Sequence, residues 1–516
     1  MSTDNPDVLV VGAGPVGLVA AAELARHGVT VRIIDKLAQP TNESRAIAVH
    51  ARSLDMLERM GAVDELIATG VKAKAMELYS GHDKLFRVPL DSLDTAYPFS
   101  LNTPQTETER VLIRHLSSLG VTVERGVELT QLAQHGEAVQ VTVRHASGKV
   151  EDITVPWVIG ADGAHSPVRH LVGGKLAGSF VGERFLLGDV DAEHNLDTDA
   201  MFTFFSPGGP VLAMPMRDGR ARVMAQVHDA PGTPLNMHPT LEQLQEVLDE
   251  RVGGIKLLKG HWLTSFELHH AQVPQYRWGR VFLAGDSAHI HSPAGGQGMN
   301  TGMQDAFNLA WKLAAVIGGQ AGDRLLDSYQ AERYPVAQSM IKFTERLSMA
   351  GTLTGAPQRI RNALLRGLSH VGAVGHAMAS TTAELTVRYP RSPIVAGKAP
   401  RGAKVAAGDH FPFLNDEDVQ KHVAGSWDVA HTTVTVAAGH GTPAAGQAGR
   451  QVLITDADSA VAGYGVVIAD PKRVLARRLG LPNGGRVVVR PDTYIGAIAP
   501  LDDPKTVADY FATLAS

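Results

Sequence analysis

Short apolar runs alternate with predicted helices in two parts of the chain, residues 7–34 and residues 281–313. Residues 7–11 (DVLVV) and 29–34 are apolar at almost every position, which is typical of strands buried on both faces of a parallel sheet. Between them, residues 15–27 form an Ala/Leu-rich stretch that predicts a helix. A similar apolar run at 281–284 precedes a Pro/Gly loop and a predicted helix from about 298 to 313. This alternation predicts an α/β architecture with a parallel sheet.

The pattern changes to period two between about residues 180 and 270, where Pro/Gly turns separate short strands at 201–205, 211–216 and 221–227. One helix, predicted for 240–252, interrupts them. We expect an antiparallel sheet inserted between the two halves of the first domain. Its Phe/Met-rich face could line a ligand pocket, although each such residue alone could equally be ordinary core. The candidates for that wall are Phe202, Phe204, Met214 and Met216.

The last third of the chain contains a long helical region followed by a second α/β unit. Residues 306–383 are predicted to be helical, and the Pro/Gly-rich residues 390–409 to form a linker. Beyond the linker we expect strands and helices in this order: strand 451–455, strand 465–468, helix 471–479, strand 486–490 and helix 505–514. The predicted domains are therefore a first part of an α/β domain (1–179), the antiparallel sheet (180–275), a second part with long helices (276–395) and a separate C-terminal unit (400–516).

Composition narrows the class of protein. The 516 residues are 44% hydrophobic and 20% charged, as in ordinary globular proteins, and the net charge of -5 gives no argument for binding nucleic acid or an anionic membrane. Cysteine is absent, which excludes disulfides, thiolate metal sites and a catalytic cysteine. The first strand begins by residue 8, which leaves no room for a signal peptide, and no apolar run approaches the roughly 18 residues that span a bilayer. These features predict a cytoplasmic protein.

The segment GAGPVG at 12–17 lies between a predicted strand and a predicted helix. Gly12, Gly14 and Gly17 would let the start of the helix approach a pyrophosphate closely. Asp35, at the end of the next strand, has the spacing expected for an acceptor of the adenosine ribose 2′-hydroxyl. Because a carboxylate there would repel a 2′-phosphate, we expect the tightly bound dinucleotide to be FAD or NAD and not NADP.

Two further strand-to-turn segments carry a carboxylate. GADGAHSPVR at 160–169 contains Asp162, and GDSAHIHSPAGGQGMNTG at 285–302 contains Asp286. The glycines before the predicted helix in the second segment would let backbone N–H groups contact an electron-rich or anionic group at the positive end of the helix dipole. Asp286 would accept hydrogen bonds from sugar-like hydroxyls.

In order and spacing, these three segments resemble those of the FAD-dependent aromatic hydroxylases, the single-component flavoprotein monooxygenases with the para-hydroxybenzoate hydroxylase fold. The resemblance covers about residues 5–390. The remaining chain is similar to the thioredoxin-like C-terminal domain of the larger members, of the polyketide-hydroxylase, phenol-hydroxylase and rifampicin-monooxygenase types. The resemblance thus implies a Rossmann-like FAD-binding domain with an inserted antiparallel substrate domain and a thioredoxin-like C-terminal domain. Without cysteine, this last domain is expected to be structural.

The resemblance also implies which residues contact the cofactor. Arg45 matches the arginine of the flavin loop, and Gln105 a glutamine that contacts the flavin. Asp162 and Gly163 match a motif implicated in both FAD and NADPH binding, and Asp35 stands where glutamate is common. The full set of residues expected at the cofactor is Gly12, Gly14, Pro15, Val16, Gly17, Asp35, Lys36, Arg45, Gln105, Asp162, Gly163, Asp286, Pro293, Gly296, Gly298, Met299 and Asn300.

The activity that the resemblance implies is oxygen insertion into an aromatic ring. NADPH would reduce FAD, O2 would give a flavin C4a-hydroperoxide, and the loop at Pro293 would help to keep water out of the pocket. This chemistry needs no protein nucleophile, and no catalytic residue is identified from the sequence. His289 and His291 are poor evidence for a metal site without further ligands.

Alternatives remain open at this stage. Baeyer–Villiger insertion and epoxidation use the same scaffold, whereas the absence of a Trp-x-Trp-x-Ile-Pro segment disfavours halogenation. A non-catalytic flavin-binding partner protein is a third class. The Phe/Met-rich sheet favours a polycyclic phenol, such as an aromatic polyketide or an antibiotic, although Arg217, Arg220 and Arg222 also lie on it. The oligomeric state is left open, a homodimer being one option.

Overall fold

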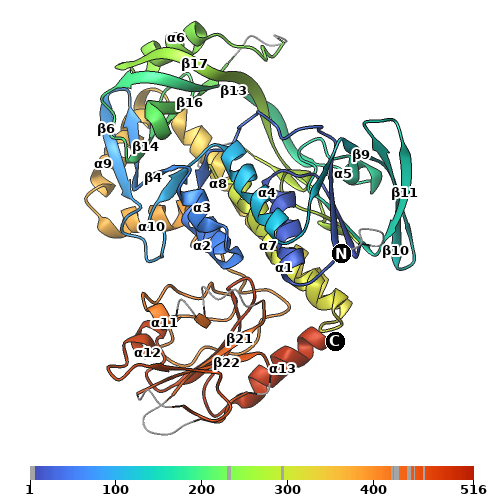
Figure 1. Ribbon diagram of the computed structural model, residues 1–516. Helices are drawn as coiled ribbons and strands as arrows, with labels where there is room; N and C mark the ends of the chain where they lie inside the picture. Colours follow the sequence, from blue (N-terminus) through green and yellow to red (C-terminus); the bar gives the residue numbers. More distant parts are fainter. Residues whose placement is uncertain are drawn as a thin grey trace.

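The computed structural model describes residues 6–228, 234–291, 296–419, 422–423, 429–437, 443–446, 448–456 and 460–516. Two sheets and a bundle of long helices form the larger part of the molecule, and a smaller α/β unit lies beside them (Figure 1).

The first sheet has six strands in the order β18-β19-β12-β1-β2-β8. All pair in parallel except β18, which runs antiparallel to β19. Their bounds are β1 (Val8–Val11), β2 (Val31–Asp35), β8 (Val123–Arg125), β12 (Trp157–Gly160), β18 (Arg277–Trp278) and β19 (Val281–Leu283). The central strands are buried on both faces, which explains their continuous apolar runs.

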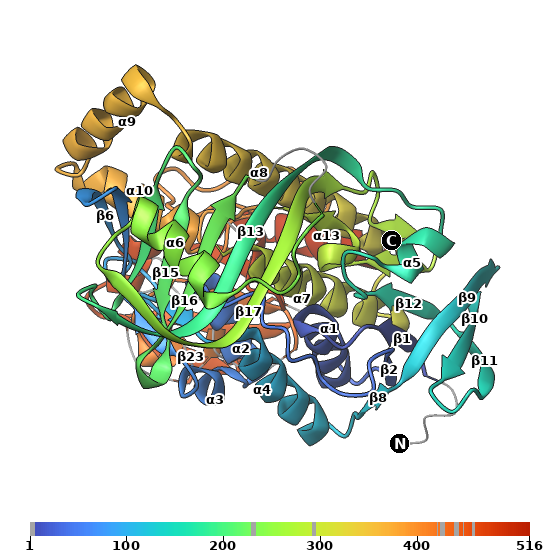
Figure 2. The same cartoon turned by 90° about the horizontal axis from the view of Figure 1, so that it is seen from above.

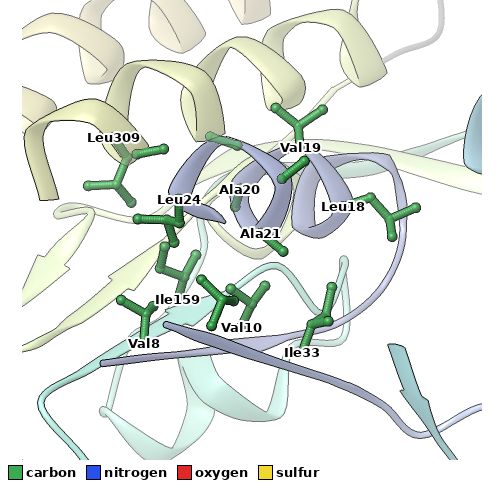
Figure 3. Close-up of a cluster of buried hydrophobic side chains, with 14 of the residues drawn as sticks. Val8, Val10, Leu18, Val19, Ala20, Ala21, Leu24, Ile33, Ile159 and Leu309 are labelled. Atoms are coloured by element: carbon green, nitrogen blue, oxygen red, sulfur yellow. The ribbon is translucent and has the colours of Figure 1, made fainter. Parts of the chain in front are cut away.

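Three helices pack together beside this sheet. The first is rich in small residues, which allow its neighbours to approach closely. Helix α1 (Pro15–Arg26) packs against both α7 (Gly298–Ile317) and α4 (Gln105–Ser118). Figure 3 shows the core below α1, where Val8, Val10 and Ile159 from the strands meet side chains of α1 and Leu309 of α7. A three-stranded antiparallel sheet lies beside these strands and consists of β9 (Val127–His135), β10 (Ala138–His145) and β11 (Val150–Val155).

The second sheet has eight strands in the order β20-β17-β13-β16-β15-β14-β5-β6, antiparallel except for the parallel pair β14 and β5. Its strands are β5 (Ala75–Ser80), β6 (Asp83–Pro89), β13 (Ala177–His194), β14 (Ala200–Phe205), β15 (Val211–Pro215), β16 (Arg220–Val227), β17 (Ile255–Gln272) and β20 (His289–Ile290). β5 and β6 come from well before the expected sheet segment 180–275, so the sheet is larger than the segment that the sequence predicts. Figure 2 shows β13 and β17 as the long, strongly curved strands of this sheet.

Helices cover both faces of the eight-stranded sheet. Helix α6 (Leu241–Arg251), which starts with a capping box between Thr240 and Gln243, packs on one face through Leu244 and Leu248. The other face packs against the long helices after α7, which the sequence predicted as one helical region. They are α8 (Asp327–Gly351), α9 (Gly355–Leu368) and α10 (Gly372–Thr382). The shorter elements are β3 (Ala48–Val49), α2 (Ala51–Met60), α3 (Val63–Ile67), β4 (Val71–Ala73), β7 (Ser100–Asn102), α5 (Pro167–Leu171) and the 3-10 turns Arg217–Gly219, Gly285–Ser287 and Asp323–Leu326.

The C-terminal unit has a mixed five-stranded sheet in the order β23-β22-β21-β24-β25. Its elements are α11 (Glu417–Val419), β21 (Thr432–Val436), β22 (Arg450–Thr455), β23 (Val466–Ala469), α12 (Val474–Leu479), β24 (Gly485–Val489), β25 (Ile495–Ala499) and α13 (Pro504–Ala515). The three strands predicted here are present, and β21 and β25 are additional. Gly and Ala weaken the strand signal of β25 (IGAIA), whereas the β-branched residues of β21 (TTVTV) favour a strand that the prediction did not include.

Candidate functional site

A large cavity of about 1490 Å³ lies between the six-stranded sheet, the eight-stranded sheet and helices α7, α8 and α10. This is larger than the ~300–1,000 Å³ that is typical of a pocket for one small molecule. Residues from all the predicted cofactor segments that the structure describes line it, together with the inner face of the eight-stranded sheet. The cavity therefore has room for a dinucleotide and a second large molecule.

The first end of the cavity lies at the carboxyl ends of three neighbouring parallel strands, β1, β12 and β19, which is where α/β sheets bind ligands. The turn after β1 is very tight, because a Cβ on Gly12 would lie 2.3 Å from the Ala161 carbonyl oxygen and one on Gly17 would lie 1.9 Å from the Gly12 carbonyl oxygen. Gly14 has open space around its Cα and lines the cavity with Pro15 and Val16.

Asp35 lies at the end of β2 and fixes this turn. Its carboxylate accepts hydrogen bonds from the backbone N–H of Ala13 (2.7 Å) and of Leu37 (2.8 Å), and Arg125 lies 3.5 Å away. One donor bonds to each oxygen, so acceptor capacity remains for a ribose hydroxyl. Lys36 and Leu37, directly after it, line the cavity.

Asp162 lies at the end of β12, and protein donors occupy its carboxylate. It accepts hydrogen bonds from the hydroxyls of Ser166 and Ser287 and from the backbone N–H of Val168. Burial raises the pKa of Asp162, whereas these hydrogen bonds oppose that shift. Arg169 donates to the carbonyl oxygens of Ser287 (3.1 Å) and Ala164 (2.6 Å), which ties the two turns together. Asp162 thus shapes the turn that presents Gly163 to the cavity.

Asp286 follows β19 and is exposed to the cavity. Desolvation by the surrounding protein raises the pKa of its carboxyl group, and the nearby Arg45 opposes this shift. Asp286 therefore presents its side chain to the cavity, whereas protein donors occupy the carboxylate of Asp162.

Helix α7 begins at the cavity wall, where Gly296, Gly298 and Met299 line it. Asn300 is fully buried and joins this helix start to β3: it donates to the carbonyl oxygen of Ala48 (2.9 Å) and accepts from the N–H of His50 (2.9 Å). The positive end of a 20-residue helix therefore faces the cavity. Pro293, predicted to lie over the flavin, falls outside the described residues.

The segment 41–46 forms another part of the wall. Arg45 is exposed and pairs with Glu43 at 2.8 Å. Gln105, at the start of α4, accepts from the N–H of Ala46 (3.3 Å) and donates to Glu109 (2.8 Å). Arg45 and Gln105 both line the cavity, and their contact with the flavin stays a prediction.

These features fit FAD. Asp35 after β2, the open turn at Gly14 after β1 and the exposed Asp286 after β19 lie in this order along the sheet edge, and the start of α7 supplies backbone donors at the wall of the cavity. We keep the residue assignments as predictions.

Comparison with known proteins gives the family. Residues 5–344 match the model of the FAD binding domain, and residues 477–516 match that of the phenol hydroxylase C-terminal dimerisation domain. The chain is 36% identical over 512 residues to 6-methylpretetramide 4-monooxygenase of Streptomyces rimosus, covering 96% of this chain and 91% of that protein. It is 32% identical over 517 residues to pentachlorophenol 4-monooxygenase of Sphingobium chlorophenolicum, covering 96% and 94%.

The chain belongs to the FAD-dependent aromatic monooxygenases. The solved structure of the OxyS anhydrotetracycline hydroxylase from Streptomyces rimosus superposes with a TM-score of 0.74 at 28% identity, covering 99% of each chain. The predicted family, fold class, cofactor and enzyme class are therefore confirmed.

The second end of the monooxygenase cavity is apolar. Strands of the eight-stranded sheet form one wall and helices α8 and α10 the opposite wall. Its apolar side chains are Met76, Leu78, Met201, Phe202, Leu212, Met214, Met224, Phe266, Phe343, Leu347, Val374 and Met378. Methionine is flexible and adapts to irregular ligand shapes.

Two of the four side chains predicted for the substrate wall line this cavity, namely Phe202 and Met214. Phe204 instead packs among core residues below α6, with its ring centroid 5.1 Å from that of Tyr79. Met216 lies at the far side of the segment 41–46, in a different cavity.

No pattern in the sequence indicated that α8 and α10 form a wall of the cavity. Phe343, Leu347 and Met378 lie more than 50 residues after the last strand of the sheet that they face, and a helical period alone does not say which ligand a buried face meets. Arg222 was placed on the sheet by the sequence pattern, which did not indicate what this side chain contacts. It is fully buried, pairs with Asp189 at 2.7 Å and donates to the carbonyl oxygen of Ala46 (2.9 Å), so that it holds the flavin-side loop.

Within the described ranges, no group of three or more His, Asp or Glu side chains could hold a metal ion. Among the helices of the same residues, none is long and apolar enough to cross a membrane.

Proposed function

We propose that this monooxygenase uses NADPH and O2 to hydroxylate a polycyclic phenol. The observation that carries the proposal is the apolar half of the 1490 Å³ cavity, whose opposite walls are strands of the antiparallel sheet and the helices α8 and α10. A flat molecule of several fused rings would bury its faces against such walls. The names of two relatives, 6-methylpretetramide 4-monooxygenase and anhydrotetracycline hydroxylase, support this substrate class.

FAD, when bound, supplies the electron transfer and the activation of O2. The protein would hold it through the Gly14 turn, Asp35 and Asp286, and the positive end of α7 would stabilise negative charge on the reduced ring. The apolar walls would exclude water from the reacting ring of the substrate. A few polar groups, Thr203, His269 and Thr381, lie among them and could orient the phenol hydroxyl.

A decisive experiment combines the visible spectrum of the purified protein with NADPH oxidation in air. We expect bound FAD and an NADPH oxidation rate that tetracyclic phenols stimulate at least tenfold, with a product heavier by one oxygen atom. Pentachlorophenol serves as the single-ring comparison, because a relative is named for it. If single-ring phenols were the better substrates, the polycyclic assignment would be wrong. Product analysis also separates ring hydroxylation from Baeyer–Villiger insertion and epoxidation.

We further propose that the enzyme is a homodimer. The match of residues 477–516 to the phenol hydroxylase dimerisation domain supports this assembly. Light scattering should give twice the 54.9 kDa mass of the chain, and a monomer mass would contradict the proposal.

A further inference from the structure

Helix α9 lies against the rest of the molecule without burying any of its residues. Its inner side chains Leu365 and Leu368 are partly buried and pack beside β6, whereas Ile360 and Leu364 are 68% and 59% exposed. Figure 2 shows α9 at an outer corner of the molecule, outside the sheets. The helix is therefore apolar on two sides, and packing within the described part of the protein accounts for only one of them.

Exposed apolar side chains continue before and after α9. Met349, near the end of α8, is 70% exposed, and Val371, directly before α10, is 45% exposed. Leu347 and Ala373 lie two residues from Met349 and Val371 and line the apolar end of the first, 1490 Å³ cavity. The exposed apolar surface thus adjoins the helical wall of that cavity.

The same stretch of chain is basic. Residues 346–383 contain four arginines and no Asp or Glu, although the net charge of the whole chain is -5. Arg346 and Arg359 are exposed, and among the described residues neither has an ion-pair partner. Arg361 has a structural role, because it donates to the carbonyl oxygen of Ala350 (2.6 Å) and thereby holds α9 against the end of α8.

The carboxylates that adjoin this stretch do not neutralise it. Asp83 of β6 pairs with Arg366 at 2.8 Å, but both side chains are at least half exposed, and such pairs contribute little to stability. Glu183 of β13 and Glu345 of α8 are half-buried, and Glu183 accepts a hydrogen bond from Ser348 (3.4 Å). A net positive charge therefore remains exposed around α9.

We define the α9 surface as the exposed apolar and basic side chains of residues 346–371. We propose that the α9 surface binds an anionic lipid membrane. Ile360 and Leu364, one helical turn apart, would enter the boundary between headgroups and acyl chains, and Arg359 and Arg366 would contact lipid phosphates. The enzyme would lie on the membrane and not span it, which agrees with the helices of the described residues.

A membrane fits this surface better than a second copy of the chain. In a two-fold dimer the same surface meets itself, so the arginines of both copies would come close together. The residues that match a dimerisation domain, 477–516, belong instead to the C-terminal unit, which Figure 1 shows on another side of the molecule from α9. A membrane supplies anionic phosphates and an apolar interior at the same place.

The position of the α9 surface indicates what docking would achieve. Molecules of several fused apolar rings concentrate in lipid, and the helical wall of the cavity adjoins this surface. The membrane would thus hold substrate close to the cavity, although the docking itself does not depend on the proposed substrate.

The first test is flotation of the full-length, FAD-loaded enzyme with lipid vesicles. Vesicles of equal parts phosphatidylglycerol and phosphatidylcholine are compared with vesicles of phosphatidylcholine alone. At about 0.1 M salt we expect a partition coefficient roughly thirtyfold higher for the anionic vesicles, and at about 1 M salt, where the Debye length is about 3 Å, we expect this difference to disappear. Equal binding to both kinds of vesicle, or no binding to either, would overturn the proposal.

Two double variants separate the apolar from the basic part of the α9 surface. Ile360→Ser with Leu364→Ser, and Arg359→Gln with Arg366→Gln, should each weaken binding to the anionic vesicles about tenfold. The reason is that a cation at the surface contributes a factor of about five, and a buried Ile or Leu contributes at least as much. Wild-type binding in either double variant would refute the assignment.

Leu258→Ser and Arg144→Gln are the matched controls, since Leu258 is 50% exposed on β17 and Arg144 is 57% exposed on β10. These variants and both double variants should keep the wild-type melting temperature and the kcat measured without lipid. If Ile360→Ser with Leu364→Ser converted a dimer into a monomer in lipid-free buffer, the α9 surface would be a contact between copies and the proposal would be wrong. Failure of the proposed function is distinguishable, because flotation requires no turnover.

Discussion

Gly12 and Gly14 lie in the same turn after β1 but have different roles. One is needed for the fold and the other for binding the ligand. Gly12 has a φ of +101°, and a Cβ on it would collide with backbone atoms of Ala161 and Asp162. Gly14 has an ordinary φ of -77° and open space toward the cavity. The first glycine is therefore needed by the protein itself and the second by what binds there.

Gly12→Ala and Gly14→Ala should consequently fail in different ways. Gly12→Ala should lower the free energy of unfolding by several kcal/mol, because the methyl group strains a left-handed backbone and displaces the turn after β12. Gly14→Ala should retain the wild-type melting temperature of the apoprotein and weaken FAD binding at least tenfold, since its methyl group would occupy the place of the pyrophosphate. Thermal denaturation of the apoproteins and fluorescence titration with FAD measure the two effects. Unchanged FAD affinity in Gly14→Ala would contradict the assigned role.

Glu384 is a buried carboxyl group near the helical wall of the cavity. Burial raises its pKa from 4.5 to about 7, and the charge of Arg333 and hydrogen bonds from Gln304 and Thr301 only partly oppose this. In the folded protein the group thus holds its proton to higher pH than in the unfolded chain. Its contribution to stability is fully present below pH 4.5 and is lost as the pH rises through 7.

Glu384→Gln should therefore flatten the pH dependence of stability. The neutral amide resembles the protonated acid, so the variant should exceed the wild type at pH 8 by up to about 3 kcal/mol and match it at pH 4.5. Urea denaturation at several pH values measures this difference. Glu137→Gln, at an exposed position, serves as the control. Parallel pH profiles of variant and wild type would show that Glu384 is already ionised in the folded state.

At the scale of elements, helix α7 joins the cavity to the C-terminal unit. Its first turn lines the cavity, and its later residues Asn308 and Lys312 enter a fully buried ionic cluster with Glu332 of α8 and with Arg490 and Asp492 of the C-terminal unit. The positive charges of Arg490 and Lys312 hold the pKa of Glu332 well below its usual range. The cluster fixes α7 relative to both of its neighbours.

Glu332→Gln should destabilise the protein by about 3–5 kcal/mol, because it leaves two buried cations without their shared partner. Urea denaturation of the apoprotein gives this number, and the fraction of FAD retained on gel filtration shows whether the start of α7 has moved. Asp327→Asn is the matched control on the same helix: it breaks an exposed pair with Arg277 and should cost less than about 1 kcal/mol. Equal effects of the two substitutions would mean that the buried cluster contributes no more than a surface pair.

At the scale of the whole molecule, the C-terminal unit packs against the helices of the cavity and stabilises them. All the residues that line the first cavity precede residue 383. The C-terminal unit nevertheless contacts α7 and α8, which form part of the cavity wall. Besides the buried cluster, Arg52 at the start of α2 donates to Thr493 (2.9 Å), and Trp311 of α7 packs in an apolar cluster with residues of β25 and α13. Figure 1 shows this unit lying against the ends of α1, α2 and α7.

Removal of residues 400–516 should therefore abolish FAD binding even though no cavity residue is deleted. The truncation exposes the apolar face around Trp311, removes the partner Thr493 from Arg52 and removes Arg490 from Glu332, so we expect an aggregation-prone chain. Soluble yield and bound flavin per chain are the measurements. A soluble truncated protein with a full complement of bound flavin would show that the C-terminal unit is not needed to form the FAD site.

The chain itself determined the parallel strands, the three strand-to-turn segments and hence the cofactor class, because those signals are local: an apolar run, glycines at fixed spacing and a carboxylate at a strand end. Only the tertiary structure decided which side chains face the cavity. Phe202 lines the cavity, whereas Phe204 lies in the core. Protein donors bond to the carboxylate of Asp162, and Arg222 is buried behind the segment 41–46. Helices α8 and α10 form the wall opposite the sheet. These outcomes depend on packing between segments far apart in sequence, and no local pattern encodes which neighbour a buried face will meet.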